Sequence, residues 1–298
     1  MSKIFVEDTN LVAIADVIRA KTETAEPLVF PNGFKSAIEG IQAGGGDSDS
    51  ALKNLIERTV TDFTIPNGVT EIGGYLFYNW RKLVSVSFND NINTIRTSAF
   101  SGCNNLVLTS LPESLSTIEG YAFYDCQNLT LTSLPSRVIY IGGHAFERCY
   151  NLALTSLPES LTEINEYTFA SCGNLPLTSL PNGITSIGNN AFYNCYDLPL
   201  TSLPNGITKI GEYAFHNCSK ITLTSLPESL DLIFRNAFYS CGGLTTITFQ
   251  SIPSSIEYNS FSGCYNLTTI NVPWAEGEVA NAPWGATNAT INYNYTGA

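Results

Sequence analysis

The chain has 298 residues, of which 44% are hydrophobic and 13% are charged, and its formal net charge is −12. It has only 14 Lys and Arg residues, so it lacks the clustered positive charge that binding to nucleic acid or to an acidic membrane surface requires. No stretch reaches the roughly 18 consecutive apolar residues of a membrane span. We therefore expect neither a nucleic-acid partner nor insertion into a membrane.

Residues 1–43 predict a small helical module. Leu11, Ile14 and Ile18 recur at helical spacing after Asn10, which suits an N-cap, and the turn in FPNGF precedes a second apolar helical face. The N-terminal sequence lacks the basic region and unbroken apolar segment of a Sec signal peptide. We therefore expect no Sec signal peptide, and a protein that is cytoplasmic at synthesis or leaves the cell by a route that the sequence does not show.

The module is followed by a short connection. Residues 44–50 are rich in Gly, Ser and Asp and predict a flexible linker. Residues 51–60, which begin ALKNLIERT, predict a capping helix that leads into the next segment.

A 23-residue pattern then recurs without insertion over residues 61–273. Each copy contains Phe, two further residues and Cys; in the first copy, Phe77 is followed by Trp80 at the cysteine position. The other copies contain Phe100, Phe123, Phe146, Phe169, Phe192, Phe215, Phe238 and Phe261, with Cys103, Cys126, Cys149, Cys172, Cys195, Cys218, Cys241 and Cys264. A repeat of this kind indicates a solenoid whose coils cover each other's apolar sides. We predict an α/β-type solenoid of mainly short β-strands with about nine coils.

Each copy predicts two short strands and a corner. LTSLP and ITSIG read as strands, and NNAFYNC reads as a short helical or irregular corner. The apolar residues of LTSLP lie three, five and eight places after Cys in the middle copies, but three, six and eight in the outer copies; a bulge is one explanation. Asn residues two places after Cys are expected to satisfy turn backbone groups.

The eight cysteines predict a buried ladder of thiols that pack as small apolar groups. Disulfides and zinc sites are the alternatives. Equivalent residues of stacked coils point in parallel directions, whereas a disulfide needs converging Cβ atoms and zinc needs converging ligands. The regular step therefore disfavours both, and no metal site is expected.

Residues 274–298 break the repeat and predict a C-terminal cap. Trp274 and Trp284 are expected to cover the last coil, because an exposed solenoid end needs a cap. The alternating stretch ATINYNY predicts a terminal strand.

No catalytic site or cofactor is predicted. The two histidines, His144 and His216, occupy variable positions that we expect to face solvent, and His216 lies two residues before Cys218 in the thiol ladder. The pair resembles a nucleophile with its base, but the other ladder cysteines have no such neighbour. The glutamates of the PES turns, Glu113, Glu159 and Glu228, are expected to be solvated. The sequence contains no phosphate-binding glycine loop.

The variable positions around each Phe–Cys pair are rich in tyrosine, which offers rigid contact area and a hydroxyl. We predict that these residues form a binding strip along one edge: Tyr121, Tyr124, Tyr150, Tyr167, Tyr193, Tyr196, Tyr213, Tyr239 and Tyr265. Their rings could also stack on sugars. The alternative is that each tyrosine shields the corner of its coil, with the concave sheet as the binding face.

The repeated unit, with its AF-x-x-C signature, resembles the BspA-like leucine-rich repeats, also called the Treponema pallidum type. The resemblance implies a curved solenoid with a β-sheet on its concave side and a role as a bacterial surface or secreted binding protein. Such proteins usually carry a signal peptide, which is not recognisable here.

The two ends resemble tail-associated proteins of phages and prophages of Gram-positive gut bacteria. On this resemblance we predict a non-enzymatic receptor-binding or host-surface recognition protein of a phage tail, located in the virion. The alternative is a cell-surface adhesin or interaction protein of the BspA-like type, on the bacterial surface or extracellular. The expected partner is a bacterial surface protein or glycan, with other tail proteins bound through the N-terminal module.

Overall fold

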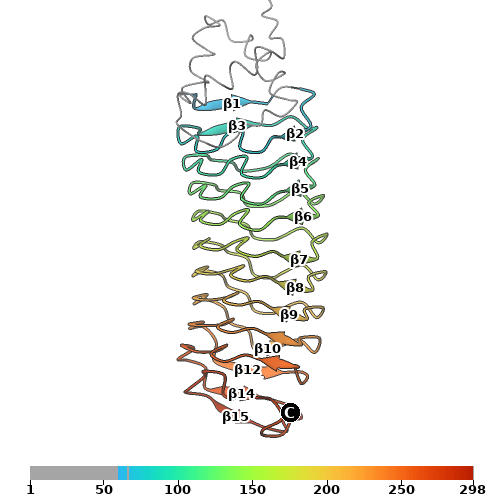
Figure 1. The fold of residues 1–298 in the computed structure, drawn as a ribbon, viewed down its shortest axis with the longest axis vertical. Coiled ribbons are helices and arrows are strands. Elements are labelled where there is room, and N and C mark those ends of the chain that lie inside the picture. Colours follow the sequence, from blue (N-terminus) through green and yellow to red (C-terminus); the bar gives the residue numbers. More distant parts are fainter. Residues whose placement is uncertain (1–59, 66, 298) are drawn as a thin grey trace, which may run out of the picture.

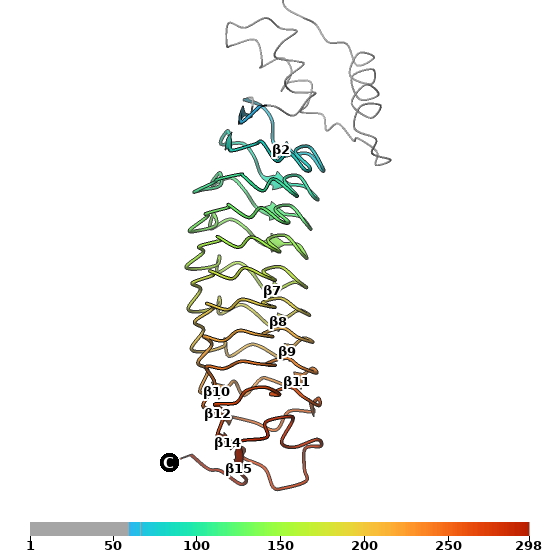
Figure 2. The same ribbon diagram turned by 90° about the vertical axis from the view of Figure 1, so that its left-hand side faces the viewer.

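The computed structural model describes residues 60–65 and 67–297, which form one column of stacked coils (Figures 1 and 2). The described residues contain no helix. The predicted helical module, the linker and all but the last residue of the predicted capping helix lie outside the described part of the chain. The predicted solenoid is confirmed.

Each coil contains one or two short strands, which pair in parallel with the strands of neighbouring coils. The strands are β1 (Asp62–Thr64), β2 (Glu71–Ile72), β3 (Ser85–Ser87), β4 (Thr94–Ile95), β5 (Thr117–Ile118), β6 (Tyr140–Ile141), β7 (Glu163–Ile164), β8 (Ser186–Ile187), β9 (Lys209–Ile210), β10 (Ser225–Leu226), β11 (Leu232–Ile233), β12 (Thr246–Phe249), β13 (Ser255–Ile256), β14 (Thr269–Asn271) and β15 (Thr290–Asn292).

The ITSIG segments form strands, as predicted. They build a four-stranded sheet in the order β2-β4-β5-β6 and a five-stranded sheet in the order β13-β11-β9-β8-β7. Partners lie one repeat apart, as in Thr94 with Thr117 and Ile187 with Ile210. The isoleucine of each strand points into the core, because alternate residues of a strand face opposite sides.

The LTSLP segments behave differently, and the strand prediction is wrong for the middle copies. Strands form here only towards the two ends of the column, as the pair β1-β3 and the sheet β10-β12-β14-β15. In β12, Ile247 and Phe249 are buried with one residue between them, which is the period of a strand. In a middle copy, two exposed residues, Thr155 and Ser156, separate buried Leu154 from Leu157. That spacing does not fit a strand.

The corners are irregular turns. Each contains two residues in the left-handed region, such as Asn190 with φ 56° and Asn194 with φ 58°. The coils nevertheless stay bonded through the corner: Phe192 N donates to Ala214 O in the next coil at 2.8 Å.

The phenylalanines form a continuous ladder in the core, from Phe77 to Phe261. Neighbouring rings are stacked, with centroids 5.0–5.7 Å apart and planes within 13° of parallel. All of these side chains are buried, as predicted.

The cysteines form a second ladder beside the first. All eight keep their thiols and are buried, which confirms the packing prediction. Each thiol also makes a hydrogen bond that the sequence did not reveal: Cys195 Sγ donates to Phe169 O of the preceding coil at 3.0 Å, and the other seven make the equivalent bond at 3.0–3.1 Å. The ladder therefore links coils as well as filling space.

The C-terminal residues close the column as predicted. Trp274 and Trp284 are buried with ring centroids 6.4 Å apart, and Trp284 Nε1 donates to Ala280 O at 2.8 Å. Strand β15 extends the sheet beyond β14.

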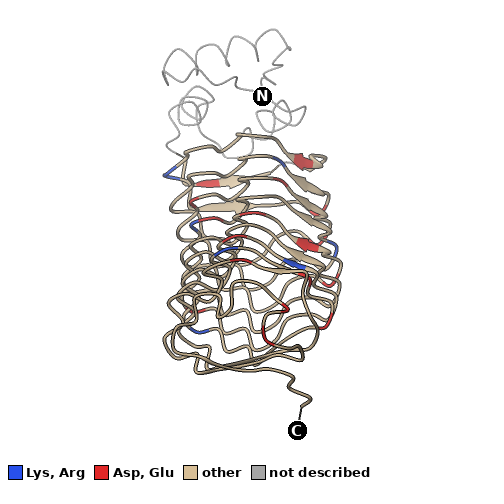
Figure 3. Cartoon of the chain, turned by 60° about the horizontal axis from the view of Figure 1, so that its bottom comes forward, with Lys and Arg blue, Asp and Glu red and all other residues tan. Residues whose placement is uncertain are grey.

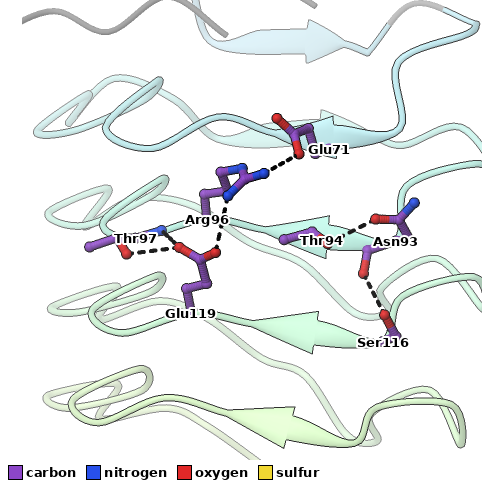
Figure 4. A network of polar contacts seen from close by, with 7 residues as sticks. All are labelled: Glu71, Asn93, Thr94, Arg96, Thr97, Ser116 and Glu119. Atoms are coloured by element: carbon purple, nitrogen blue, oxygen red, sulfur yellow. Dashed lines mark hydrogen bonds and ion pairs between the residues drawn. The ribbon is translucent and has the colours of Figure 1, made fainter.

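Polar side chains tie neighbouring coils together on the outside. Arg96 contacts Glu71 at 2.7 Å and Glu119 at 3.4 Å, and Glu119 also accepts from the backbone and hydroxyl of Thr97 (Figure 4). Such exposed ion pairs contribute at most about 1 kcal/mol each. Charged residues are scattered over many coils rather than gathered in one block (Figure 3).

The repeated asparagines only partly match their prediction. Asn105 donates to Arg81 O and Asn266 donates to Gly242 O, both backbone groups of the preceding coil. Asn128, Asn151 and Asn174 instead donate to the side-chain oxygen of the preceding asparagine at 3.3–3.5 Å. Equivalent side chains one coil apart can reach each other, so they form a ladder of their own.

Candidate binding surface

The nine predicted tyrosines, which we call the tyrosine strip, all lie at the corners of the coils, in three columns. The first column lies five residues before Cys, the second two residues before it and the third one residue after it. These columns are Tyr121, Tyr167 and Tyr213; Tyr124, Tyr193 and Tyr239; and Tyr150, Tyr196 and Tyr265.

The first column is held in an unusual backbone conformation. Tyr121 has φ 58°, and Tyr167 and Tyr213 have φ 53°. For a residue with a side chain, the left-handed region costs roughly 1–2 kcal/mol, less for Asn. The same corner position holds Asn190 and Asn236 in other coils.

Two stacks of rings run along the strip, each with a histidine in the middle. His144 lies between Tyr121 and Tyr167, with centroids at 4.3 and 4.5 Å and planes within 9° of parallel. His216 lies between Tyr193 and Tyr239, with centroids at 4.6 and 4.8 Å. The prediction that both histidines simply face solvent is therefore wrong, because both are half-buried between rings.

The stacks could have been found in the sequence. Residues 121, 144 and 167 differ by one repeat, as do residues 193, 216 and 239, so their rings had to lie in successive coils. Stacking also limits what these rings can bind: each tyrosine of a stack has one face covered by a histidine. Sugar stacking, which needs an open ring face, is correspondingly restricted.

The third column is the most exposed. Tyr150 is 39% exposed, Tyr196 48% and Tyr265 74%. In the other two columns only Tyr121 is exposed to a similar degree, and the remaining five tyrosines are half-buried. Corner shielding, the alternative to binding, therefore describes the second column, whose three tyrosines are all half-buried, better than the third.

Acidic side chains surround the first stack. Glu147 Oε2 lies 2.5 Å from His144 Nδ1. Burial, followed by the charges of Glu147 and Glu166, raises the pKa of Tyr121 and Tyr167. Their phenols therefore remain neutral hydrogen-bond donors at physiological pH.

The second stack has different surroundings. His216 Nδ1 is buried and has no hydrogen-bond partner among the residues that the structure describes. Burial lowers the pKa of His216 from its usual 6.5. Tyr213 lies against the same ring, tilted, at 5.5 Å.

The geometry does not assemble a nucleophile. Burial raises the pKa of Cys218 well above its usual value, and its thiol donates to Phe192 O at 3.1 Å. His216, two residues earlier, packs between tyrosines instead. The glutamates of the PES turns are exposed, as expected: Glu113, Glu159 and Glu228.

Two further searches concern the described residues only. They contain no group of three or more His, Cys, Asp or Glu side chains placed to hold a metal ion. Nor does any helix within them have the length and apolar character needed to cross a bilayer.

Residues 50–176 and 162–281 match the BspA type leucine rich repeat region. None of the curated proteins matches this chain. Among solved structures, a leucine-rich repeat protein from Bacteroides ovatus is 23% identical, with a TM-score of 0.40, over 79% of this chain and 84% of that one. A leucine rich cell surface protein from Faecalibacterium prausnitzii is also 23% identical, with a TM-score of 0.40, over 80% and 83%. The leucine rich repeat protein of T. pallidum is 24% identical, with a TM-score of 0.35, over 70% and 78%.

Proposed function

This chain belongs to the BspA type leucine rich repeat family, and from that premise we propose that it is a non-enzymatic adhesin or interaction protein of the bacterial cell surface. Leucine-rich repeat proteins of this type generally bind other proteins, and they are typically extracellular. The solenoid supplies a long rigid face, and the tyrosine strip supplies the contact residues.

The observation that carries the proposal is the exposure of the third tyrosine column. Tyr150, Tyr196 and Tyr265 leave large rings in water at equivalent corners, although the core beneath them is already complete. Tyrosine is enriched among the residues that dominate binding energy, because it buries a large area with few rotatable bonds.

The first column supports the same conclusion. Asn suits the left-handed corner better than Tyr, and the chain uses Asn at Asn190 and Asn236. The corner itself does not require the rings of Tyr121, Tyr167 and Tyr213, so their cost is consistent with a role in contact.

We favour a protein partner over a glycan. The histidines cover one face of four tyrosines, whereas ring edges and hydroxyls remain suited to the mixed apolar and polar contacts of a protein interface.

A double variant, Tyr150→Ala with Tyr196→Ala, tests the strip. We expect binding of the purified protein to intact bacterial cells to weaken about tenfold or more, the loss typical of central tyrosines. Tyr140→Ala is the matched control, because Tyr140 is 44% exposed but lies in β6, outside the strip. Thermal melts check that each variant folds. If the double variant binds like the wild type and Tyr140→Ala loses binding, the binding site lies on the sheet and not on the strip.

A phage-tail protein is the second candidate, supported by the resemblance of both ends of the sequence to tail-associated proteins. In this reading the N-terminal residues attach to the virion and the solenoid recognises a host. Mass spectrometry of induced phage particles and of washed cells separates the two: presence in particles supports the phage candidate, and presence only on cells supports the adhesin.

A further inference from the structure

The chain's two histidines occupy the same kind of place in different surroundings. Both are sandwiched between tyrosines of neighbouring coils. His144 has the carboxylate of Glu147 at its Nδ1, whereas Nδ1 of His216 is buried with no partner in the described part of the chain. Adding a proton therefore has different consequences in the two stacks.

We propose that His216 makes the tyrosine strip acid-sensitive: its protonation separates the stack of Tyr193, His216 and Tyr239 and so weakens binding at this part of the strip. The effect on binding rests on the proposed function, whereas the separation of the stack does not. The stack around His144 differs, because the carboxylate of Glu147 lies at Nδ1 of that ring.

The chemistry of imidazole gives the reason. A neutral ring has one donor nitrogen and one acceptor nitrogen, and a protonated ring has two donors. With Nδ1 buried and unpartnered, the neutral ring keeps its proton on Nε2. Protonation then creates a buried N–H at Nδ1 that has lost water without gaining an acceptor, which is an expensive arrangement.

Within residues 60–65 and 67–297, no carboxylate relieves this cost. The titratable groups in contact with the imidazole are three phenols, those of Tyr213 and of the two tyrosines that sandwich it. Glu212, on the same coil, contacts Arg235 of the next coil at 2.6 Å. Burial is the cause that lowers the pKa of His216, and no charged group of the described residues counters it.

The direction of the pH effect follows. The pKa of His216 is lower in the folded protein than in the unfolded chain, so the folded state binds fewer protons below pH 6.5. The closed stack is therefore fully stable above pH 6.5 and loses stability as the pH falls from there through the lower pKa of His216 in the folded protein. At His144, a protonated ring keeps an acceptor in Glu147.

NMR tests the stack without any ligand. The full-length protein has only two histidines and so gives two sets of imidazole signals, which H144Q and H216Q assign. We expect His216 to titrate below pH 6.5, with the ring signals of Tyr193 and Tyr239 shifting at the same midpoint. A midpoint at or above 6.5, or tyrosine signals that ignore the titration, would overturn the proposal. Circular dichroism confirms that both variants are folded.

Binding to intact bacterial cells at about pH 7.5 and pH 5.5 tests the consequence. We expect the dissociation constant of the wild type to rise in acid, the change to vanish in H216Q, and the change to persist in H144Q. If the stack opens in NMR but binding ignores pH, the link between this stack and binding is wrong, while the acid-sensitive stack stands. The proposed site itself fails only if the double variant at Tyr150 and Tyr196 binds like the wild type. If binding weakens in acid while NMR shows that the stack stays closed, His216 does not cause the acid sensitivity and the proposal is overturned.

Discussion

At each corner the cysteine side chain meets two requirements. It is small enough for a fully enclosed position, and its thiol donates to the phenylalanine carbonyl of the preceding coil. Burial raises the pKa of Cys195 to about 12, so the thiol keeps its proton, which that donation needs. Trp80 occupies the position in the first described coil and donates instead to Val60 O.

The thiol bond predicts an effect of substitution. Cys172→Ala removes the donor and leaves a small void, so we expect the free energy of unfolding to fall by about 1–2 kcal/mol. Urea denaturation measures it. Cys172→Ser keeps a donor in the same place and should differ from Ala; equal effects of the two variants would show that the hydrogen bond contributes nothing.

Among the elements, the phenylalanine ladder couples successive coils most directly. Phe192 stacks on Phe169 at 5.5 Å and on Phe215 at 5.4 Å, so one side chain contributes to two coil interfaces. Strands add less, because most are only two residues long and the middle copies have one instead of two.

Removal of one ring should therefore be costly. We expect Phe192→Ala to lower the free energy of unfolding by about 3–5 kcal/mol, the usual loss for a buried Phe. The control is Tyr196→Ala at a nearby exposed corner, which should change it by less than about 0.5 kcal/mol. Denaturation of both variants measures these changes. A loss under about 1 kcal/mol for Phe192→Ala would show that its ring contributes little to the stability of the core.

For the whole molecule, the constant spacing of the repeat predicted most of the fold. The spacing of Phe192 and Cys195 was enough to predict coils and a buried ladder, and the ITSIG segments predicted the strand that every middle coil contains. It could not reveal the thiol bond, because the acceptor carbonyl lies in the preceding coil and has no sequence signature. LTSLP was misread because the three-residue step between apolar positions in the middle copies, as from Leu154 to Leu157, was explained by a bulge in a strand, whereas the backbone there forms no strand. The histidine stacks were visible in the register, but their partly buried surroundings depended on packing.

The column also predicts where unfolding begins. A solenoid is stabilised by contacts between neighbouring coils, so its ends depend on their caps. Trp284→Ala should cost about 3–5 kcal/mol locally. Hydrogen exchange should then rise first in β14 and β15, while β7 and β8 stay protected. Uniform loss of protection along the column would contradict nearest-neighbour stability.

The thiol-to-carbonyl bond has a consequence for how the number of repeats can change in evolution. From Phe77 to Phe238, the phenylalanine carbonyl of each coil accepts a hydrogen bond from the cysteine of the next coil. Duplicating or deleting one complete unit therefore leaves each donor facing an equivalent acceptor. The length of the solenoid can therefore change by whole repeats, without a new contact between coils having to evolve.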